Sequence, residues 1–223
     1  MNSLASIWIG FSLLASQTAY ASEPSSLCFD FKNPVKQPII KPIKSGGKKD
    51  STAGEKFSDE HLGEWGAARG VVEKSVYEVY QAILDPFTIK DPDKAQVTLT
   101  QENRNGFNAF QIREIKISPF PLINIEWIEQ WAFVITKGKD LDPREMVISY
   151  QKSEGTSHIK SLCGSIVLKQ IGKQKTDVFL YEQMKAARRN FKDIIDGHLG
   201  TLRTLRKVRS VPVPSPARSG NPH

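Results

Sequence analysis

One carboxylate in the sequence stands among aromatic residues at a spacing that could hold it against a buried ligand. In segment 123–135, Trp127, Glu129 and Trp131 recur at every second position, which places them on one face of a β-strand. A carboxylate on such an apolar face costs stability unless it is paired or hydrated. Glu129 is therefore either a polar anchor that orients a ligand in a cavity, or the ion-pair partner of Arg113 on a neighbouring strand, or exposed by a different strand register.

Apolar residues that share this face, or that lie on a C-terminal helix able to cover it, are candidate walls of the cavity. Aromatic residues at strand spacing also build ordinary cores, so lining a cavity and filling a core are both open interpretations. The candidate ligand-binding residues, together with Glu129, are Trp127, Trp131, Phe133, Tyr150, Phe191, Ile195 and Leu199.

No catalytic motif accompanies these residues. His158 and His198 are far apart in the sequence and neither lies in a Cys or His cluster, so their spacing predicts no metal site. The sequence contains no G-x-S-x-G motif, and Cys163 has no obvious base beside it. Glycine-rich phosphate loops are also missing from the sequence. We predict no catalytic residue, no metal and no cofactor.

The first residues are typical of an export signal. An apolar run over 4–14 leads to Ala19-Tyr20-Ala21, which has the small-x-small form of a signal-peptidase site. The run is shorter than the roughly 20 apolar residues that a membrane-spanning helix needs. We expect cleavage after Ala21 and an exported protein, periplasmic or secreted. An uncleaved N-terminal anchor is the alternative.

Export matters for the two cysteines, Cys28 and Cys163. An oxidising compartment permits a disulfide, and the one intramolecular pairing would tie the N-terminal extension to the domain. Two unpaired thiols, with Cys163 simply buried, are the alternative.

Basic charge gathers at the C-terminal end. The 223 residues carry a formal net charge of +7, and residues 183–223, with 9 basic and 2 acidic side chains, account for a net +7 by themselves. A basic helix can attract an anionic membrane surface, or it is a solvated helix face. We expect no nucleic acid, because aromatic residues do not interleave with the basic cluster and no zinc, RNP or GxxG signature occurs.

Periodicity over about 63–209 predicts one domain. Ser75 and Glu78 have the spacing of a capping box before a helix over 76–84. Short spacers between successive strands predict an antiparallel meander, and an amphipathic helix over about 183–208 closes the domain. The six strand candidates are 96–102, 107–117, 123–135, 145–152, 158–170 and 176–183.

The remaining segments have compositions that build no core. Residues 1–21 are the signal segment, residues 22–62 a Pro-, Gly- and Lys-rich extension, and residues 210–223 a Pro-rich tail.

This order of elements resembles the START-related, or SRPBCC, helix-grip superfamily of lipid-transfer domains and polyketide cyclases. The resemblance covers about 63–209 and rests on residues 73–80 leading into Leu84-Asp85-Pro86, on the strand from Trp127 to Trp131, on Gly155-Thr156 and on the terminal helix. It implies an α+β fold in which a curved antiparallel sheet wraps around the long C-terminal helix and leaves a cavity for an apolar ligand.

These observations favour an exported, non-catalytic carrier of an apolar or amphiphilic, lipid-like ligand. A cyclase- or hydrolase-like enzyme that uses Glu129 and a tyrosine in the same cavity is one alternative. An envelope protein that binds partners through its tails is another.

Overall fold

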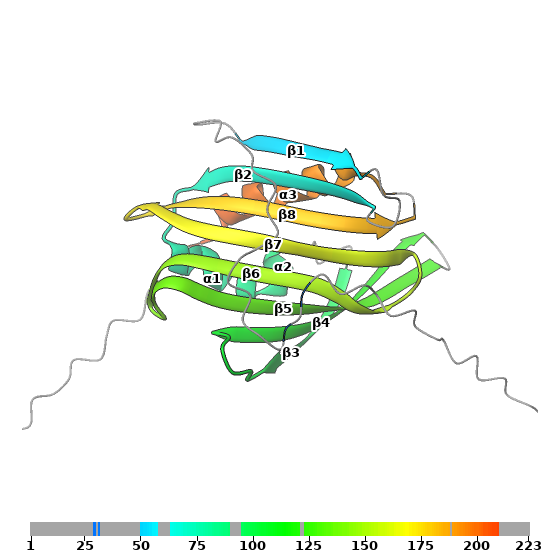
Figure 1. Ribbon diagram of the computed structural model, residues 1–223, viewed down its shortest axis with the longest axis horizontal. Coiled ribbons are helices and arrows are strands. Elements are labelled where there is room, and N and C mark those ends of the chain that lie inside the picture. Colours follow the sequence, from blue (N-terminus) through cyan, green and yellow to red (C-terminus); the bar gives the residue numbers. More distant parts are fainter. Residues whose placement is uncertain are drawn as a thin grey trace, which may run out of the picture.

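The computed structural model describes residues 29, 31, 50–57, 63–89, 95–120, 123–187 and 189–209. Within these residues, eight strands form one sheet and three helices lie on one of its faces, behind the sheet in Figure 1. We call the face toward the helices the inner face and the opposite one the outer face. The signal segment 1–21, most of the extension and the tail 210–223 lie outside the described residues.

The sheet has the strand order β1-β2-β8-β7-β6-β5-β4-β3, and every neighbouring pair is antiparallel. The predicted meander therefore runs from β3 to β8, and the N-terminal strands join it beside β8. The elements are β1 (Ser51–Lys56), β2 (Glu64–Val72), α1 (Val76–Leu84), α2 (Pro86–Ile89), β3 (Ala95–Glu102), β4 (Ala109–Phe120), β5 (Ile123–Lys139), β6 (Asp142–Gly155), β7 (Ile159–Gly172), β8 (Lys175–Ala186) and α3 (Phe191–Lys207). The α+β helix-grip fold class is confirmed.

Helix α1 begins and ends where the sequence predicts. The Ser75 hydroxyl accepts a hydrogen bond from the Glu78 amide, and the Glu78 carboxylate accepts one from the Ser75 amide at 2.9 Å. This capping box satisfies amides that the first helical turn leaves unpaired. The apolar side of α1, which includes Val79 and Ile83, is buried in the main core between the helices and the inner face.

The C-terminal helix is shorter than predicted. It begins at Phe191 and not near residue 183, because β8 continues to Ala186 and pairs with β7 and β2 on its two sides. Asn190 then caps α3, with Asp193 completing a second capping box. Met184 and Ala186, which the predicted helix included, thus belong to the end of β8, where cross-strand pairing outweighs helical periodicity.

Strand β1 is an addition to the predicted elements, in a segment that we assigned to the extension. It pairs with β2 at the edge of the sheet. Two glycines let α3 approach these strands closely: an added Cβ at Gly66 would lie 2.8 Å from Ile194 Cγ2, and one at Gly54 would lie 3.0 Å from Phe191 Cδ2. Glycine at this edge therefore serves helix packing and is not a sign of a flexible linker.

Helix α3 is fastened to the N-terminal strands at both of its ends. The first amide, that of Phe191, donates to Glu64 Oε2 at 2.6 Å. Near the other end, Arg206 donates to the Val71 carbonyl at 3.0 Å and forms an ion pair with Asp50. The hydrogen bond from Arg206 lowers the pKa of the Asp50 carboxyl.

Gly197 lies on the open side of α3, so its replacement tests the helix without disturbing its packing. An added Cβ at this position meets no atom within 4 Å. Since glycine costs a helix interior about 1 kcal/mol relative to alanine, Gly197→Ala should raise the free energy of unfolding by about 1 kcal/mol, measured by urea denaturation. A loss of stability would contradict the exposed position of this residue.

Part of the N-terminal extension packs on the outer face. The Phe29 amide donates to Gln151 Oε1, and Gln151 Nε2 donates to the Phe29 carbonyl, both at 2.9 Å. Phe31 meets the ring of Phe110 edge-on, with ring centroids 5.8 Å apart. Cys163, in the same apolar cluster, is disulfide-bonded. The sequence has one other cysteine, Cys28, which lies outside the described residues.

Candidate functional site

Strand β5 presents three aromatic residues and one carboxylate on the inner face. Trp127, Glu129, Trp131 and Phe133 alternate along the strand, and all four are buried. Glu129 Oε1 accepts a hydrogen bond from Trp127 Nε1 at 2.7 Å, and Glu129 Oε2 accepts one from Trp131 Nε1 at 2.8 Å. The two indoles thus solvate a carboxylate that is 1% exposed.

Arg113 of β4 lies opposite Glu129 in the sheet register and is 0% exposed. Its guanidinium donates to Gln111 Oε1 at 2.6 Å and to the Ile83 carbonyl at 2.8 Å, and it covers the ring of Trp131 at 4.0 Å. Burial lowers the pKa of Arg113 to about 10, and the negative charge of Glu129 acts in the opposite direction. The guanidinium therefore stays charged near neutral pH.

A second polar contact extends this group across the sheet. Tyr150 stacks on Trp131 with ring centroids 4.3 Å apart, and its hydroxyl donates to Glu182 Oε2 at 2.9 Å. The ring reaches Glu182 by passing over Gly164, where an added Cβ would lie 2.3 Å from the Tyr150 hydroxyl. Burial, followed by the nearby Glu182 carboxylate, raises the pKa of Tyr150 well above its usual value.

The predicted lining residues on α3 lie elsewhere. Phe191 and Ile195 face Gly54 of β1, with Ile195 Cδ1 3.1 Å from an added Cβ there. Leu199 packs against the main core. The structure therefore brings the β5 and β6 candidates together. It places Phe191 and Ile195 over β1, at the opposite edge of the sheet, with four strands between β1 and β5.

Three solved structures with lipid transfer in their names share the arrangement of these elements. Human StarD13 lipid transfer and protein localization domain has a TM-score of 0.55 and 12% identity over 74% of this chain and 86% of its own. The STAR-related lipid transfer protein fragment from Xanthomonas axonopodis has a TM-score of 0.54 and 15% identity over 74% of this chain and 95% of its own. Human StAR-related lipid transfer protein 5 has a TM-score of 0.52 and 11% identity, covering 79% and 88%. The chain has the START-related helix-grip fold. No family model matches its sequence, and no curated protein matches it.

Several polar residues on the inner face of this helix-grip fold were not among the predicted site residues. Gln111 and Glu182 alternate correctly with their buried neighbours, but their partners come from strands or helices far away in the chain. His198 is a further buried residue, on α3, and its Nε2 makes no hydrogen bond within the part of the chain that the structure describes. Isolation of a histidine in the sequence gave no sign of this burial.

His198 should make the stability of the helix-grip domain sensitive to acid. Burial lowers the pKa of His198 to about 4, with a hydrogen bond to the Gly66 backbone acting the other way. Below about pH 6.5, the ordinary pKa of histidine, His198 binds a proton in the unfolded chain but stays neutral in the folded chain. Stability therefore falls as the pH falls. We expect a loss of about 2 kcal/mol from this residue between about pH 7 and about pH 5.

The measurement is the free energy of unfolding in urea at several pH values, for the native chain and for His198→Gln. On acidification from about pH 7 to about pH 5, the free energy of unfolding of the variant should fall by about 2 kcal/mol less than that of the native chain. Equal pH dependence of the two proteins would contradict a neutral, buried His198.

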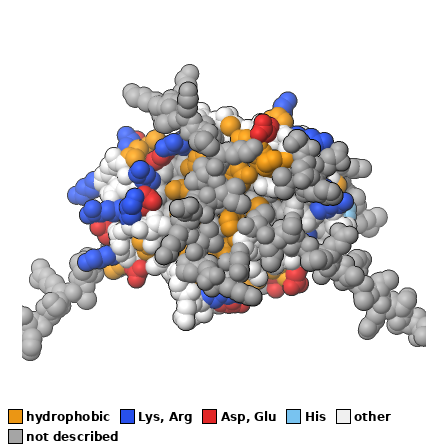
Figure 2. All heavy atoms as spheres, viewed as in Figure 1, with side chains coloured by type: hydrophobic (Ala, Val, Ile, Leu, Met, Phe, Trp, Pro, Cys, Tyr) orange, Lys and Arg blue, Asp and Glu red, His pale blue; other side chains and the backbone are white. Residues whose placement is uncertain are grey.

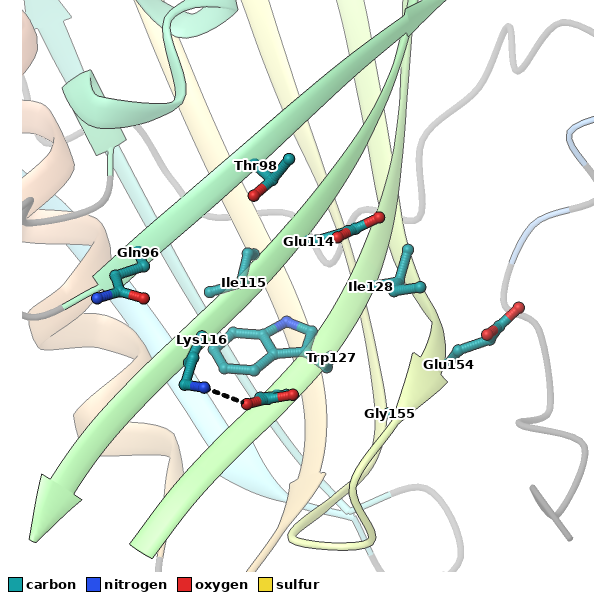
Figure 3. Close-up of a pocket in the computed structure, with 10 residues that line it drawn as sticks. Gln96, Thr98, Glu114, Ile115, Lys116, Trp127, Ile128, Glu154 and Gly155 are labelled. Atoms are coloured by element: carbon teal, nitrogen blue, oxygen red, sulfur yellow. Dashed lines mark ion pairs between the residues drawn. The ribbon is translucent and has the colours of Figure 1, made fainter. Parts of the chain in front are cut away.

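A pocket of about 470 Å³ opens beside the aromatic strand. Figure 3 shows Trp127 next to the ion pair between Lys116 and Glu126, with residues of β3, β4, β5 and β6 around them. The Lys116–Glu126 pair spans 2.7 Å, and both side chains are largely exposed. The pocket thus reaches the edge of the aromatic group from a polar surface. No described group of three or more His, Cys, Asp or Glu side chains could hold a metal ion, and no described helix is long and apolar enough to cross a membrane.

Proposed function

We propose that this protein is an exported, non-catalytic carrier that binds an apolar or amphiphilic, lipid-like ligand at the aromatic wall on the inner face of the sheet. This wall lies under α1 and not, as the sequence predicts, under the C-terminal helix. The observation that carries the proposal is the opposed pair of buried charges, Arg113 and Glu129, within an aromatic wall on the inner face. The aromatic side chains would contact the apolar body of the ligand. The charged pair would meet its polar group.

The cost of burying charge supports a role beyond packing. Replacing buried groups of opposite charge with apolar residues of similar volume is often neutral or stabilising, so a core alone does not need the charges of Arg113 and Glu129. Arg113 Nη1 is buried and makes no hydrogen bond within the described residues. A hydroxyl or carbonyl oxygen of an amphiphile would supply the missing acceptor.

The fold supports the same class of ligand. The structures at TM-scores of 0.55, 0.54 and 0.52 carry lipid transfer in their names, and a helix-grip sheet provides the concave surface on which such a ligand lies. Trp131 is 2% exposed and Phe133 is 0% exposed, and the ring of Tyr80 on α1 lies 5.8 Å from that of Phe133. A ligand therefore reaches them only by displacing side chains of this wall or by a shift of α1.

Glu129→Gln tests the anchor. The full-length chain would be titrated with two fluorescent probes, an NBD-labelled sterol and an NBD-labelled fatty acid. We expect saturable binding of at least one probe, weakened about tenfold in Glu129→Gln because a charge-assisted hydrogen bond is lost. Glu102→Gln, which changes a carboxylate paired with Arg104 outside the lining of the pocket, should bind as the native chain does.

Three results would decide against the carrier. One is the absence of any lipid in organic extracts of native protein purified from its own host, together with no probe binding. Another is equal binding by Glu129→Gln in a variant whose circular dichroism shows that it is folded. The third is chemical turnover of a bound molecule, which would favour the cyclase- or hydrolase-like alternative. The raised pKa of Tyr150 weighs against that alternative, since a phenol so hard to ionise is a poor acid or base near neutral pH.

Export is a proposal that rests on residues 1–21, and the mass of the secreted chain tests it: cleavage leaves Ser22 as the first residue. The contact of the basic C-terminal helix with an anionic membrane also stays a proposal. Lys192, Arg203 and Lys207 of α3 are exposed, whereas Arg206 is engaged by Asp50.

A further inference from the structure

Two hairpins of the sheet end side by side. The turn between β5 and β6 and the turn between β7 and β8 lie at the same end, because β6 and β7 pair from Glu145 and Lys169 inward. We call residues 137–144 and 169–175 the hairpin tips. They lie at the left of the sheet in Figure 1.

Each hairpin tip exposes one large aliphatic side chain. Leu141 is 47% exposed and Ile171 is 50% exposed, and with Phe87 and Leu99 they are the exposed large apolar residues of the described chain. Single apolar residues on a surface need no explanation by themselves. Here, however, two of them occupy neighbouring turns, where neither adds to the core.

Basic residues lie in the same two turns as Leu141 and Ile171. Lys139, Arg144 and Lys173 are exposed and have no ion-pair partner within the described ranges, and Figure 2 shows Lys and Arg gathered at this edge of the molecule. The acidic groups at the tips are partly engaged. Asp140 accepts a hydrogen bond from Asn108 and Glu145 pairs with Lys137, which leaves Asp142 exposed.

The end of α3 adds cations on the same side. Arg206 is bonded to the carbonyl of Val71, at the end of β2, and the next residues of the chain include Glu73, which pairs with Lys175 of the second hairpin. The exposed Arg203 and Lys207 of α3 therefore lie toward the hairpin tips and not toward the other end of the sheet.

We propose that the hairpin tips dock on an anionic membrane surface. Leu141 and Ile171 enter the boundary between headgroups and acyl chains, while Lys139, Arg144 and Lys173 contact the lipid phosphates. Protruding single aliphatic residues with cations beside them match this interface. A protein partner would favour a broader apolar patch, and a nucleic acid would favour aromatic residues for stacking. This docking is independent of the proposed ligand.

The test is co-sedimentation of the full chain with two kinds of vesicle, one of phosphatidylcholine alone and one that also contains phosphatidylglycerol. We expect binding to the anionic vesicles only, decreasing as salt is added. Lys139→Glu combined with Lys173→Glu should weaken it about tenfold or more. Leu141→Ser combined with Ile171→Ser should weaken it about tenfold while leaving the charge unchanged.

Matched controls lie at the opposite end of the sheet and on other exposed positions. Lys56→Glu combined with Arg189→Glu makes the same change in net charge. Phe87→Ser combined with Leu99→Ser removes the other two exposed large apolar residues of the described chain, which are 47% and 37% exposed. Both controls should bind the anionic vesicles as the native chain does. Failure of the native chain to bind, or an equal loss in the charge control, would overturn the proposal, as would capture of soluble polyglutamate in place of vesicles.

Discussion

Arg113→Met is expected to lower the free energy of unfolding by about 3–5 kcal/mol, the range found when one of two opposite buried charges is removed. Methionine keeps the apolar stem of arginine but not the guanidinium, so the loss combines the missing charge and hydrogen bonds with the space left over the ring of Trp131. Glu129, 1% exposed, would lose the opposite charge across β4 and β5, and the carbonyl of Ile83 would lose its donor. Urea denaturation measures the change.

A double variant separates charge from packing. Arg113→Met combined with Glu129→Gln removes both charges, so it should be more stable than Arg113→Met alone, by about 1–3 kcal/mol. A single variant that loses less than about 1 kcal/mol would show that the Glu129 carboxylate does not depend on this guanidinium.

Gly164→Ala has the second-largest expected effect, a loss of about 3 kcal/mol. The new methyl group would lie 2.3 Å from the Tyr150 ring carbon Cζ and 2.6 Å from the backbone oxygen of Tyr181. Tyr150 would have to leave its position, which breaks its bond to Glu182 and its stacking on Trp131. Overpacking and the loss of a hydrogen bond to a charged group each cost about 1–3 kcal/mol.

The same substitution at Gly197 is the matched control, because an added Cβ there meets nothing within 4 Å. Thermal denaturation should show one alanine variant less stable than the native chain and the other more stable. If Gly164→Ala were neutral, Tyr150 would not pass over this position.

The elements that local sequence determines were predicted well. Ser75 and Glu78 form the capping box that their spacing predicted, and α1 has the predicted bounds. The strands of the meander follow from turn residues and alternation. The start of α3 could not be predicted in this way. Residues 184–186 are in a strand because they pair with β2 and β7, and these partners are far away in the sequence.

The candidate site divides in the same manner. Alternation along the strand correctly predicted that Glu129 shares a face with Trp127 and Trp131. Whether Arg113 lies beside Glu129 depends on the register between β4 and β5, which the structure supplies. The contact between Tyr150 and Glu182 could not be predicted, because it needs a residue without a side chain on the strand between them. A glycine in a strand signals such an approach only when the register is known.

The hydrogen bonds between Phe29 and the Gln151 amide have a practical consequence for anyone who produces this protein. A recombinant chain trimmed to begin at Asp50 would lack these contacts and leave Phe110, Ala132 and Cys163 uncovered on the outer face of the sheet. Such a fragment would expose an apolar surface and an unpaired thiol. A chain that keeps the contact between Phe29 and Gln151 is therefore the better choice for crystallisation.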